Sequence, residues 1–170
     1  YGRHNVIRNY IKLLCDKAGL QSDLEVDIFK EGCKRPADVY IHNFITGKDV
    51  AIDVACTHAI TKTHNKEVKK IYDGDIDILY AVKYYENKKI KEYNQNMNQY
   101  GLDKQCEFIP FIVGANGTIG DQANVVLRKI SALLAPKWRM KYSVVKANIN
   151  KTICCKIIAS NFKMFSRCFL

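Results

Sequence analysis

The sequence lacks the features that mark several large classes of protein. It has no run of about 18 apolar residues, the length that a membrane-spanning helix needs, and its first residues do not have the pattern of a signal peptide. It contains no internal repeat and no low-complexity linker. With 170 residues, nearly half of them apolar, the chain can bury a real core as one globular domain. It opens on Tyr1 rather than Met, so we expect it to be part of a longer polypeptide.

Cysteine motifs are also missing. The seven cysteines are odd in number and form no Cys-x-x-Cys pair, and several lie inside apolar runs, as small core residues do. A zinc site built from Cys33, Cys56, His58 and Cys106 has a spacing that matches no common template. We therefore expect a reduced, intracellular protein whose four histidines have ordinary polar roles.

Acidic residues are scarce relative to basic ones. The chain has 17 Asp and Glu against 27 Lys and Arg, which gives a formal net charge of +10 and a pI near 9.2. A balance of this kind favours an acidic partner, and nucleic acid is the default candidate. Nucleic acid is therefore the partner that we expect, with no role for a membrane.

The charge imbalance is greatest at 136–170, which contain eight Lys or Arg and no Asp or Glu. Apolar residues recur there at helical spacing, namely Tyr142, Val145, Ile149, Ile153 and Ile157. We expect a basic amphipathic helical extension, packed on a core domain of residues 1–135. Its Lys146, Lys151 and Lys156 are expected to contact phosphates. A solvated helix that only aids solubility gives the same pattern, as does a membrane-surface helix, but no other element supports a membrane.

Hydrophobic periodicity alternates between helical and strand-like along the chain. The expected elements are a helix at 5–18, a strand at 24–29, a hairpin at 35–57, helices at 63–72 and 76–100, a strand at 106–113, a turn at 114–117, a helix at 122–134 and a helical region from Pro136 to 165. Pro110, inside the last strand, indicates a sheet edge or a bend. This order predicts an α/β fold.

The hairpin at 35–57 is centred on Thr46-Gly47. Paired residues of an antiparallel hairpin have numbers that add to a constant, and a loop at these two residues fixes that constant at 93. Asp53 then lies opposite Tyr40, with Asp38 one diagonal away. Diagonal neighbours are about 7–8 Å apart, which is close enough for two carboxylates to share a divalent cation.

Alternation of side chains places Asp38 and Asp53 on one face of this hairpin, beside the small Ala51 and Ala55. The opposite face is apolar and belongs in the core, with Val39, Ile41, Val50, Ile52 and Val54. The two aspartates can be explained as solvated residues on a half-exposed sheet. Against that explanation, Asp is depleted in strands, and alanines stand where a wet surface carries Lys, Thr or Glu. A metal site is the alternative that we pursue.

The order of elements and the acidic pair together resemble the PD-(D/E)XK nuclease superfamily, whose core is αβββαβ. More specifically, the chain is similar to the nuclease-like domain downstream of the reverse transcriptase in retroelement polyproteins. The matching pieces are GRHNVIRNYIKLLCDKAGL at 2–20, Glu25, RPADVYI at 35–41, AIDVACT at 51–57, KIKEY at 89–93 and FIPFIVGANG at 108–117. The resemblance implies a restriction-endonuclease-like fold with a mixed sheet flanked by helices, followed by basic C-terminal helices.

The resemblance also implies roles for individual residues. Asp38 in RPAD matches the first metal-binding aspartate, Asp53 matches the acidic residue of the third strand, and Glu25 matches the acidic residue that precedes both. The superfamily usually has a lysine two residues after the second acid, whereas this chain has Ala55. In the retroelement relatives the lysine lies on the following helix, where Lys89 is its match.

Further basic residues near these positions have expected roles. Lys83, Lys88 and Lys91 lie in the same basic stretch as Lys89 and are alternatives for the catalytic cation. A solvated helix face accounts for any one of them equally well. Lys88 and Lys91 are also expected to bind nucleic acid, as is Arg35, which can hold a phosphate through two hydrogen bonds or pair with a nearby carboxylate.

The activity that the resemblance implies is endonucleolytic hydrolysis of DNA phosphodiester bonds, in the nucleus. Carboxylate oxygens suit Mg²⁺ or Mn²⁺, and such ions polarise a phosphate and lower the pKa of a bound water. A lysine ammonium adds electrostatic stabilisation. Two alternatives remain open. One is a catalytically inactive nucleic-acid-binding module with the same fold, for which Ala55 argues. The other is a structural domain of a polyprotein whose basic face binds RNA.

Overall fold

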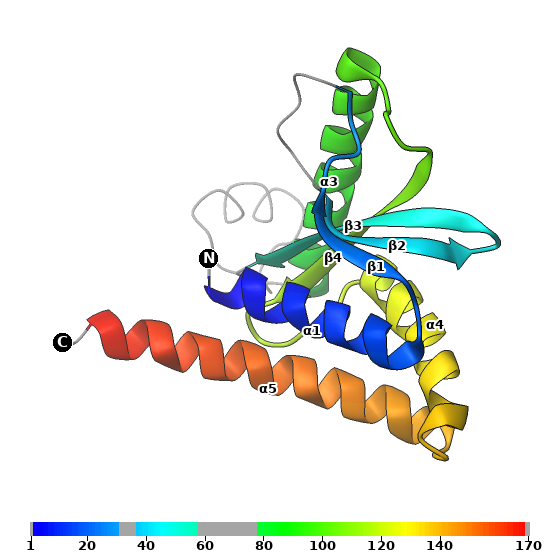
Figure 1. The fold of residues 1–170 in the computed structure, drawn as a ribbon. Coiled ribbons are helices and arrows are strands. Elements are labelled where there is room, and N and C mark those ends of the chain that lie inside the picture. Colours follow the sequence, from blue (N-terminus) through cyan, green and yellow to red (C-terminus); the bar gives the residue numbers. More distant parts are fainter. Residues whose placement is uncertain (1, 31–36, 58–77, 169–170) are drawn as a thin grey trace.

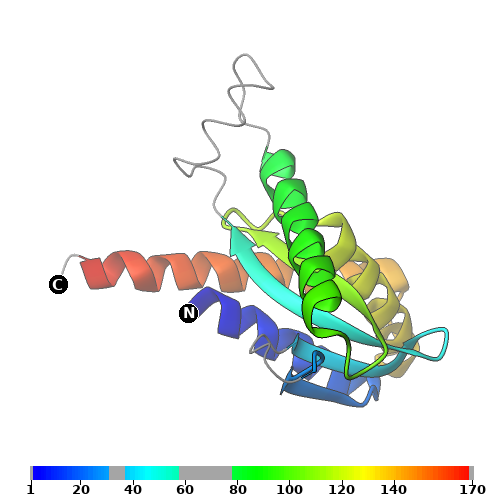
Figure 2. The ribbon, with the colours of Figure 1, turned by 90° about the horizontal axis from the view of Figure 1, so that it is seen from above.

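The computed structural model describes residues 2–30, 37–57 and 78–168. Its elements are α1 (Gly2–Ala18), β1 (Ser22–Val26), β2 (Ala37–Ile45), β3 (Lys48–Thr57), α3 (Ile78–Tyr100), β4 (Cys106–Gly114), α4 (Asp121–Lys137) and α5 (Tyr142–Cys168). They form one sheet with helices on both faces (Figure 1). α3 crosses one face of the sheet and α1 and α4 cover the other (Figure 2), while α5 packs on α1 and α4 on their side away from the sheet. The helix expected at 63–72 lies outside the described residues, as do Cys33, Arg35 and His58.

The four strands lie in the order β1-β2-β3-β4. β1, β2 and β3 pair antiparallel, whereas β3 and β4 pair parallel. The expected α/β class is therefore confirmed, as a mixed four-stranded sheet flanked by helices. β4 is an edge strand, which suits Pro110 because proline cannot donate a hydrogen bond to a neighbour on its outer side.

The hairpin turn forms where the sequence predicts it. Thr46 and Gly47 both have positive φ, 46° and 80°, as a type I′ turn requires, and Ile45 pairs with Lys48. The predicted pairing of Asp53 with Tyr40 is wrong, because Tyr40 pairs with Ala51.

A bulge in β2 causes this change of register. Between the pairs Ile45↔Lys48 and Ile41↔Val50, residues 42–44 stand against Asp49 alone, and Asn43 has a φ of 50°. Asp49 holds the bulge, since its Oδ1 accepts a hydrogen bond from the Asn43 N–H at 2.9 Å. The extra residues move the pairing constant from 93 to 91 for the rest of β2.

α1 and α4 pack on the sheet, and α5 packs on α1 and α4, through the larger of two cores. Its contributors from α1 and α4 include Ile11, Leu14, Leu127 and Ile130. From α5 come Val145, Ile149, Ile153 and Ile157, the apolar positions that helical spacing picked out, while Tyr142 is 44% exposed. α5 is thus part of the main core. Within the described part of the chain, no helix has both the length and the apolarity to cross a membrane.

α3 packs on the other face through a smaller core. Tyr40 and Ala51 of the sheet are buried there with Phe29, and Tyr93 of α3 packs against them. The ring of Tyr93 stacks on Phe108 of β4 with ring centroids 4.4 Å apart. These contacts fix the rotation of α3 about its axis and so decide which of its lysines faces the sheet.

Two expected boundaries are wrong. The strand expected at 24–29 ends at Val26, because Glu25 has a left-handed φ of 54° that extended alternation does not accommodate. Ile28 and Phe29 turn instead into the smaller core.

Pro136, expected to begin the last helical region, lies inside α4 one residue before its end. Arg139 follows with a φ of 52°, and the Met140 N–H donates to the Ala135 carbonyl at 3.0 Å. This closing pattern ends a helix, so α5 begins only at Tyr142. Proline is common in the first turn of a helix, which is why Pro136 predicts a helix start. In the structure Pro136 lies instead in the last turn of α4.

Candidate active site

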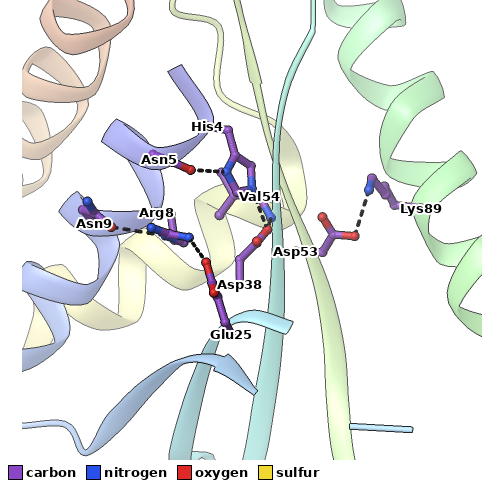
Figure 3. A network of polar contacts seen from close by, with 9 residues as sticks. All are labelled: His4, Asn5, Arg8, Asn9, Glu25, Asp38, Asp53, Val54 and Lys89. Carbon is purple, nitrogen blue, oxygen red and sulfur yellow. Dashed lines mark hydrogen bonds and ion pairs between the residues drawn. The ribbon is translucent and has the colours of Figure 1, made fainter. Parts of the chain in front are cut away.

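An ion pair joins β3 to α3 at the centre of the molecule. The Lys89 ammonium donates a hydrogen bond to Oδ2 of Asp53 at 2.9 Å (Figure 3). Burial raises the pKa of the Asp53 carboxyl, and Lys89 partly opposes that effect. The nearby negative charge of Asp38 raises this pKa further, and His4 lowers it. A carboxylate that is costly to ionise and that faces a lysine is the type of group that functional sites contain.

Asp38 lies close by but points the other way. Its Oδ2 accepts a hydrogen bond from the Val54 N–H at 2.6 Å and lies 3.0 Å from Nε2 of His4 on α1. In Figure 3 the Asp38 side chain lies on the α1 side of the sheet and Asp53 on the α3 side. The expectation that both aspartates share one face is therefore not met.

Alternation fails at the start of β2. Ala37 and Tyr40 both belong to the smaller core under α3, while Val39 belongs to the larger core under α1. The Asp38 carboxylate lies towards α1, where it meets His4. A hydrogen bond with that carboxylate raises the pKa of His4, more than burial lowers it.

Glu25 pairs with a cation from α1. Its carboxylate accepts a hydrogen bond from Arg8, and its side chain is 61% exposed. Arg8 and His4 are four residues apart, so they lie on one face of α1, and each contacts one of the predicted metal ligands. In the described part of the chain, no three His, Cys, Asp or Glu side chains form a group that could hold a metal ion.

The two aspartates offer the type of ligand that a magnesium ion needs, but in this structure they point to opposite sides of the sheet. Mg²⁺ is commonly held by one or two carboxylates, with waters and substrate phosphates completing its shell. Asp53 and Asp38 would be the residues to hold it. A cavity of about 30 Å³ adjoins Asp53 and is lined on its polar side by Lys89, Glu92 and Asn96. Its size is that of roughly one water molecule.

The described residues contain a larger cavity, of about 550 Å³, elsewhere. It lies between α3 and the start of α4, and Lys83 and Asn87 contribute to its wall. Glu86 also lines this cavity, and its Oε1 accepts a hydrogen bond from the Gln122 N–H at 2.9 Å. Of the expected lysines, Lys83 therefore faces this cavity and Lys89 faces Asp53.

The five described residues among those expected to bind nucleic acid do not form one surface. Lys88 and Lys91 are exposed on α3, and Lys151 is exposed on α5, which packs on α1 and α4 on the other side of the sheet. Arg35 lies outside the described residues.

The remaining two lysines are held by neighbouring side chains. The Lys146 ammonium donates to Asn124 at 2.9 Å and to Asn150 at 2.8 Å, and burial lowers its pKa. The Lys156 ammonium lies over the Tyr10 ring, 5.2 Å from its centroid. Lys146 and Lys156 thus pack against α4 and α1, and their expected contact with phosphates stays a prediction.

A zinc site shared by Cys56 and Cys106 is excluded by strand pairing. Cys106 pairs with Asp49, and Cys56 pairs with Val113, so the two thiols lie towards opposite ends of the parallel ladder. Burial raises the pKa of each thiol to about 11. Both are therefore protonated at neutral pH, as small core residues are.

His4 and Arg8 are the site residues that sequence reasoning missed. The helix was expected to begin at residue 5, which left His4 outside it, although the helix begins at Gly2. The available signal was their spacing of four residues, which puts two cations on one side of a helix next to an acidic sheet. Comparison of the chain with family models, curated proteins and solved structures found no match.

Proposed function

We propose that this chain is a restriction-endonuclease-like domain that hydrolyses DNA phosphodiester bonds in a metal-dependent way, within a retroelement-encoded polyprotein. The observation that carries the proposal is the contact between Lys89 and Asp53 at 2.9 Å. The resemblance requires a lysine from the helix that follows the third strand, and four lysines of α3 were candidates. Lys89, the one that the motif match selects, is the one that meets the acidic residue.

The arrangement of elements supports the same proposal. The order α1-β1-β2-β3-α3-β4 and the mixed sheet agree with an αβββαβ core. Ala55, two residues after Asp53, cannot supply the usual cation, and Lys89 supplies a positive charge at the place where one is needed. The missing lysine in the strand motif is then a displacement and not a loss.

Each residue has a distinct task in this proposal. A bound Mg²⁺ would polarise the scissile phosphate and lower the pKa of a water. Asp53 and Asp38 hold that charge near the sheet, while the Lys89 ammonium stabilises the negative charge that develops on the phosphate oxygens. Substrate and ion must compete with the present partners, since Asp53 faces Lys89 and Asp38 faces His4.

A catalytically inactive nucleic-acid-binding module with the same fold is the second candidate. It is favoured by Glu25, which is exposed and paired with Arg8, and by the opposite directions of Asp38 and Asp53 (Figure 3). Under this alternative the lysine and the aspartate form an ion pair that only stabilises the packing of α3 on the sheet. Activity measurements separate the two candidates.

Relaxation of supercoiled plasmid is the test. The parent protein should nick plasmid with Mg²⁺ or Mn²⁺ and should stop when EDTA removes the metal. Asp53→Asn should lose at least about 100-fold in rate, the scale of losing one preorganised electrostatic group. Asp103→Asn, the same change at an exposed residue, should retain the parent rate. A parent protein that binds plasmid but nicks none with either metal would establish the second candidate.

A further inference from the structure

The outward face of α3 has an unusual composition. Five residues spaced by three or four positions lie along it, and all five are exposed: Lys83, Asn87, Lys91, Asn94 and Asn98. Lys88 and Gln95 flank this row and are exposed as well. We call these seven residues the outer face of α3. Lysine ammonium and carboxamide groups therefore make up the row and its flanks.

Both acidic residues of α3 lie away from this outer face. Glu86 is only 5% exposed and accepts a hydrogen bond from the start of α4. Glu92 lines the small cavity beside Asp53. Among the described residues, none of the outer-face lysines takes part in an ion pair, although Lys88 lies 5.8 Å from the centroid of the Tyr85 ring. Within the described ranges, the outer face thus has three lysines without a direct ion pair, although Lys83 lies near enough to Glu86 to lower the pKa of that carboxyl.

A helix surface that serves only solubility usually has a different pattern of charged residues. Solvated helices usually mix Glu with Lys at a spacing of four residues, because such pairs stabilise the helix. Here the positions four residues after Lys83 and Lys91 are Asn87 and Gln95, and only Lys88 is followed at that spacing by an acid, Glu92. Carboxamides add little to helix stability, but they can both donate and accept hydrogen bonds at one site.

We propose that the outer face of α3 is a binding surface for double-stranded DNA. An α-helix with its side chains is about 10–12 Å across, and the major groove of B-DNA is about 12 Å wide. Lysines 83, 88 and 91 contact phosphates, while the carboxamides of Asn87, Asn94 and Asn98 reach base edges. Asparagine pairs with adenine through two hydrogen bonds, so the surface favours duplexes that contain A·T pairs.

This surface is separate from the proposed active site. Lys89 and Glu92 point from α3 towards the sheet and the Asp53 cavity, whereas the outer-face residues are exposed, and Lys83 and Asn87 among them border the separate, larger cavity beside α4. The DNA segment that α3 holds is therefore not the segment whose phosphate meets Asp53. The inference rests on the proposed function for its choice of DNA among polyanions, but binding and cleavage are assigned to different residues and can fail independently.

Binding should be measured by fluorescence anisotropy with a DNA duplex of about 20 base pairs, two helical turns, in EDTA so that nothing is cleaved. Lys83→Gln/Lys88→Gln/Lys91→Gln should weaken binding at least tenfold. The slope of log affinity against log salt should become shallower by up to about three. The matched control, Lys17→Gln/Lys141→Gln/Lys163→Gln, removes three exposed charges from α1, α5 and the residue before α5 and should change the slope by less than about one.

The carboxamides need a readout of their own. Asn87→Ala/Asn94→Ala/Asn98→Ala should leave the salt slope unchanged and should lower the preference for A·T-containing over G·C-only duplexes about tenfold. An RNA duplex should bind more weakly than DNA, because the major groove of A-form RNA is too narrow for side chains to read.

Equal losses in the two lysine triple variants, or tighter binding of RNA than of DNA, would overturn the inference. If the α3 variants behave as expected while the parent protein cleaves nothing, the DNA surface stands and the proposed nuclease activity falls. If the parent cleaves DNA and the α3 lysine triple variant binds DNA as tightly as the parent, the proposed nuclease activity stands and the DNA surface on α3 falls. Melting curves of both lysine variants should match that of the parent, because substitutions at exposed positions usually change stability little.

Discussion

Lys89 and Asp53 are 36 positions apart in the sequence, yet the ammonium of one donates to the carboxylate of the other at 2.9 Å. The contact brings a lysine from α3 to a strand that lies between two neighbours in the sheet. It exists because Tyr93, one turn further along α3, stacks on Phe108 and fixes the rotation of the helix. Packing and site geometry are therefore coupled through α3.

The first prediction concerns the cost of ionising Asp53. Its folded-state pKa is raised above the value in the unfolded chain, so the folded state binds the proton more tightly. The stability that this group contributes is present below pH about 3.8 and is lost as pH rises through the folded pKa. Asp53→Asn should lack this loss, so the stability of the variant relative to the parent should increase across that window. Thermal melting from pH 3 to 7 measures this difference in stability between Asp53→Asn and the parent, with Asp103→Asn as the control. A difference that stays constant with pH would contradict the prediction.

The second prediction concerns the contact between His4 and Asp38. A hydrogen bond with Asp38 raises the pKa of His4. Stability from the contact is therefore present below pH about 6.5 and is lost as pH rises through the folded pKa. Proton NMR of the imidazole should show the His4 pKa falling in Asp38→Asn. The same titration in Asp103→Asn should match the parent. An unchanged His4 pKa in Asp38→Asn would mean that the two side chains do not meet in solution.

The third prediction concerns the bulge in β2. Asp49 accepts hydrogen bonds from the Asn43 N–H at 2.9 Å and from the buried Tyr40 hydroxyl at 2.8 Å. Asp49→Ala leaves both donors without this partner and should cost about 1–3 kcal/mol of unfolding free energy. Tyr40→Phe removes only the second bond together with its donor, so it should cost less. Denaturant unfolding of the two variants measures this, and equal costs would show that the bond to Asn43 contributes nothing.

The stability that Asp49 contributes to the bulge changes with pH in the opposite direction to the stability that Asp53 contributes. The hydrogen bonds from Asn43 and Tyr40 lower the pKa of Asp49. Its contribution is present above pH about 3.8 and is lost as pH falls through the folded pKa. The difference in stability between the parent and Asp49→Ala should therefore shrink in acid.

Local sequence signals predicted some elements well. The turn at Thr46-Gly47 and the edge position of the strand with Pro110 follow from backbone chemistry, which acts over a few residues. The register of the hairpin could not be predicted in the same way. It depends on a left-handed Asn43, which is held by a side chain six positions away, and a residue with positive φ is rare enough that periodicity does not anticipate it.

The site was predictable only in part for a similar reason. Lys89 could have been separated from Lys88 and Lys91 by helical phase alone, because it precedes Tyr93 by four residues and so shares the inner face of α3. The direction in which the Asp38 side chain points could not have been predicted from the sequence. It follows from a break in alternation at the start of β2 and from a partner, His4, that lies 34 residues earlier on a different element.

The most direct test of the central claim is the rate of Mg²⁺-dependent plasmid nicking by Lys89→Ala and by Lys88→Ala. The two residues are adjacent in sequence and carry the same charge, but Lys89 contacts Asp53 and Lys88 is exposed on the outer face of α3. Lys89→Ala should lose at least about 100-fold with little change in affinity for Mn²⁺, and Lys88→Ala should lose much less. Equal losses in the two variants would contradict the account, because general attraction of phosphate would then explain what we assign to one positioned lysine.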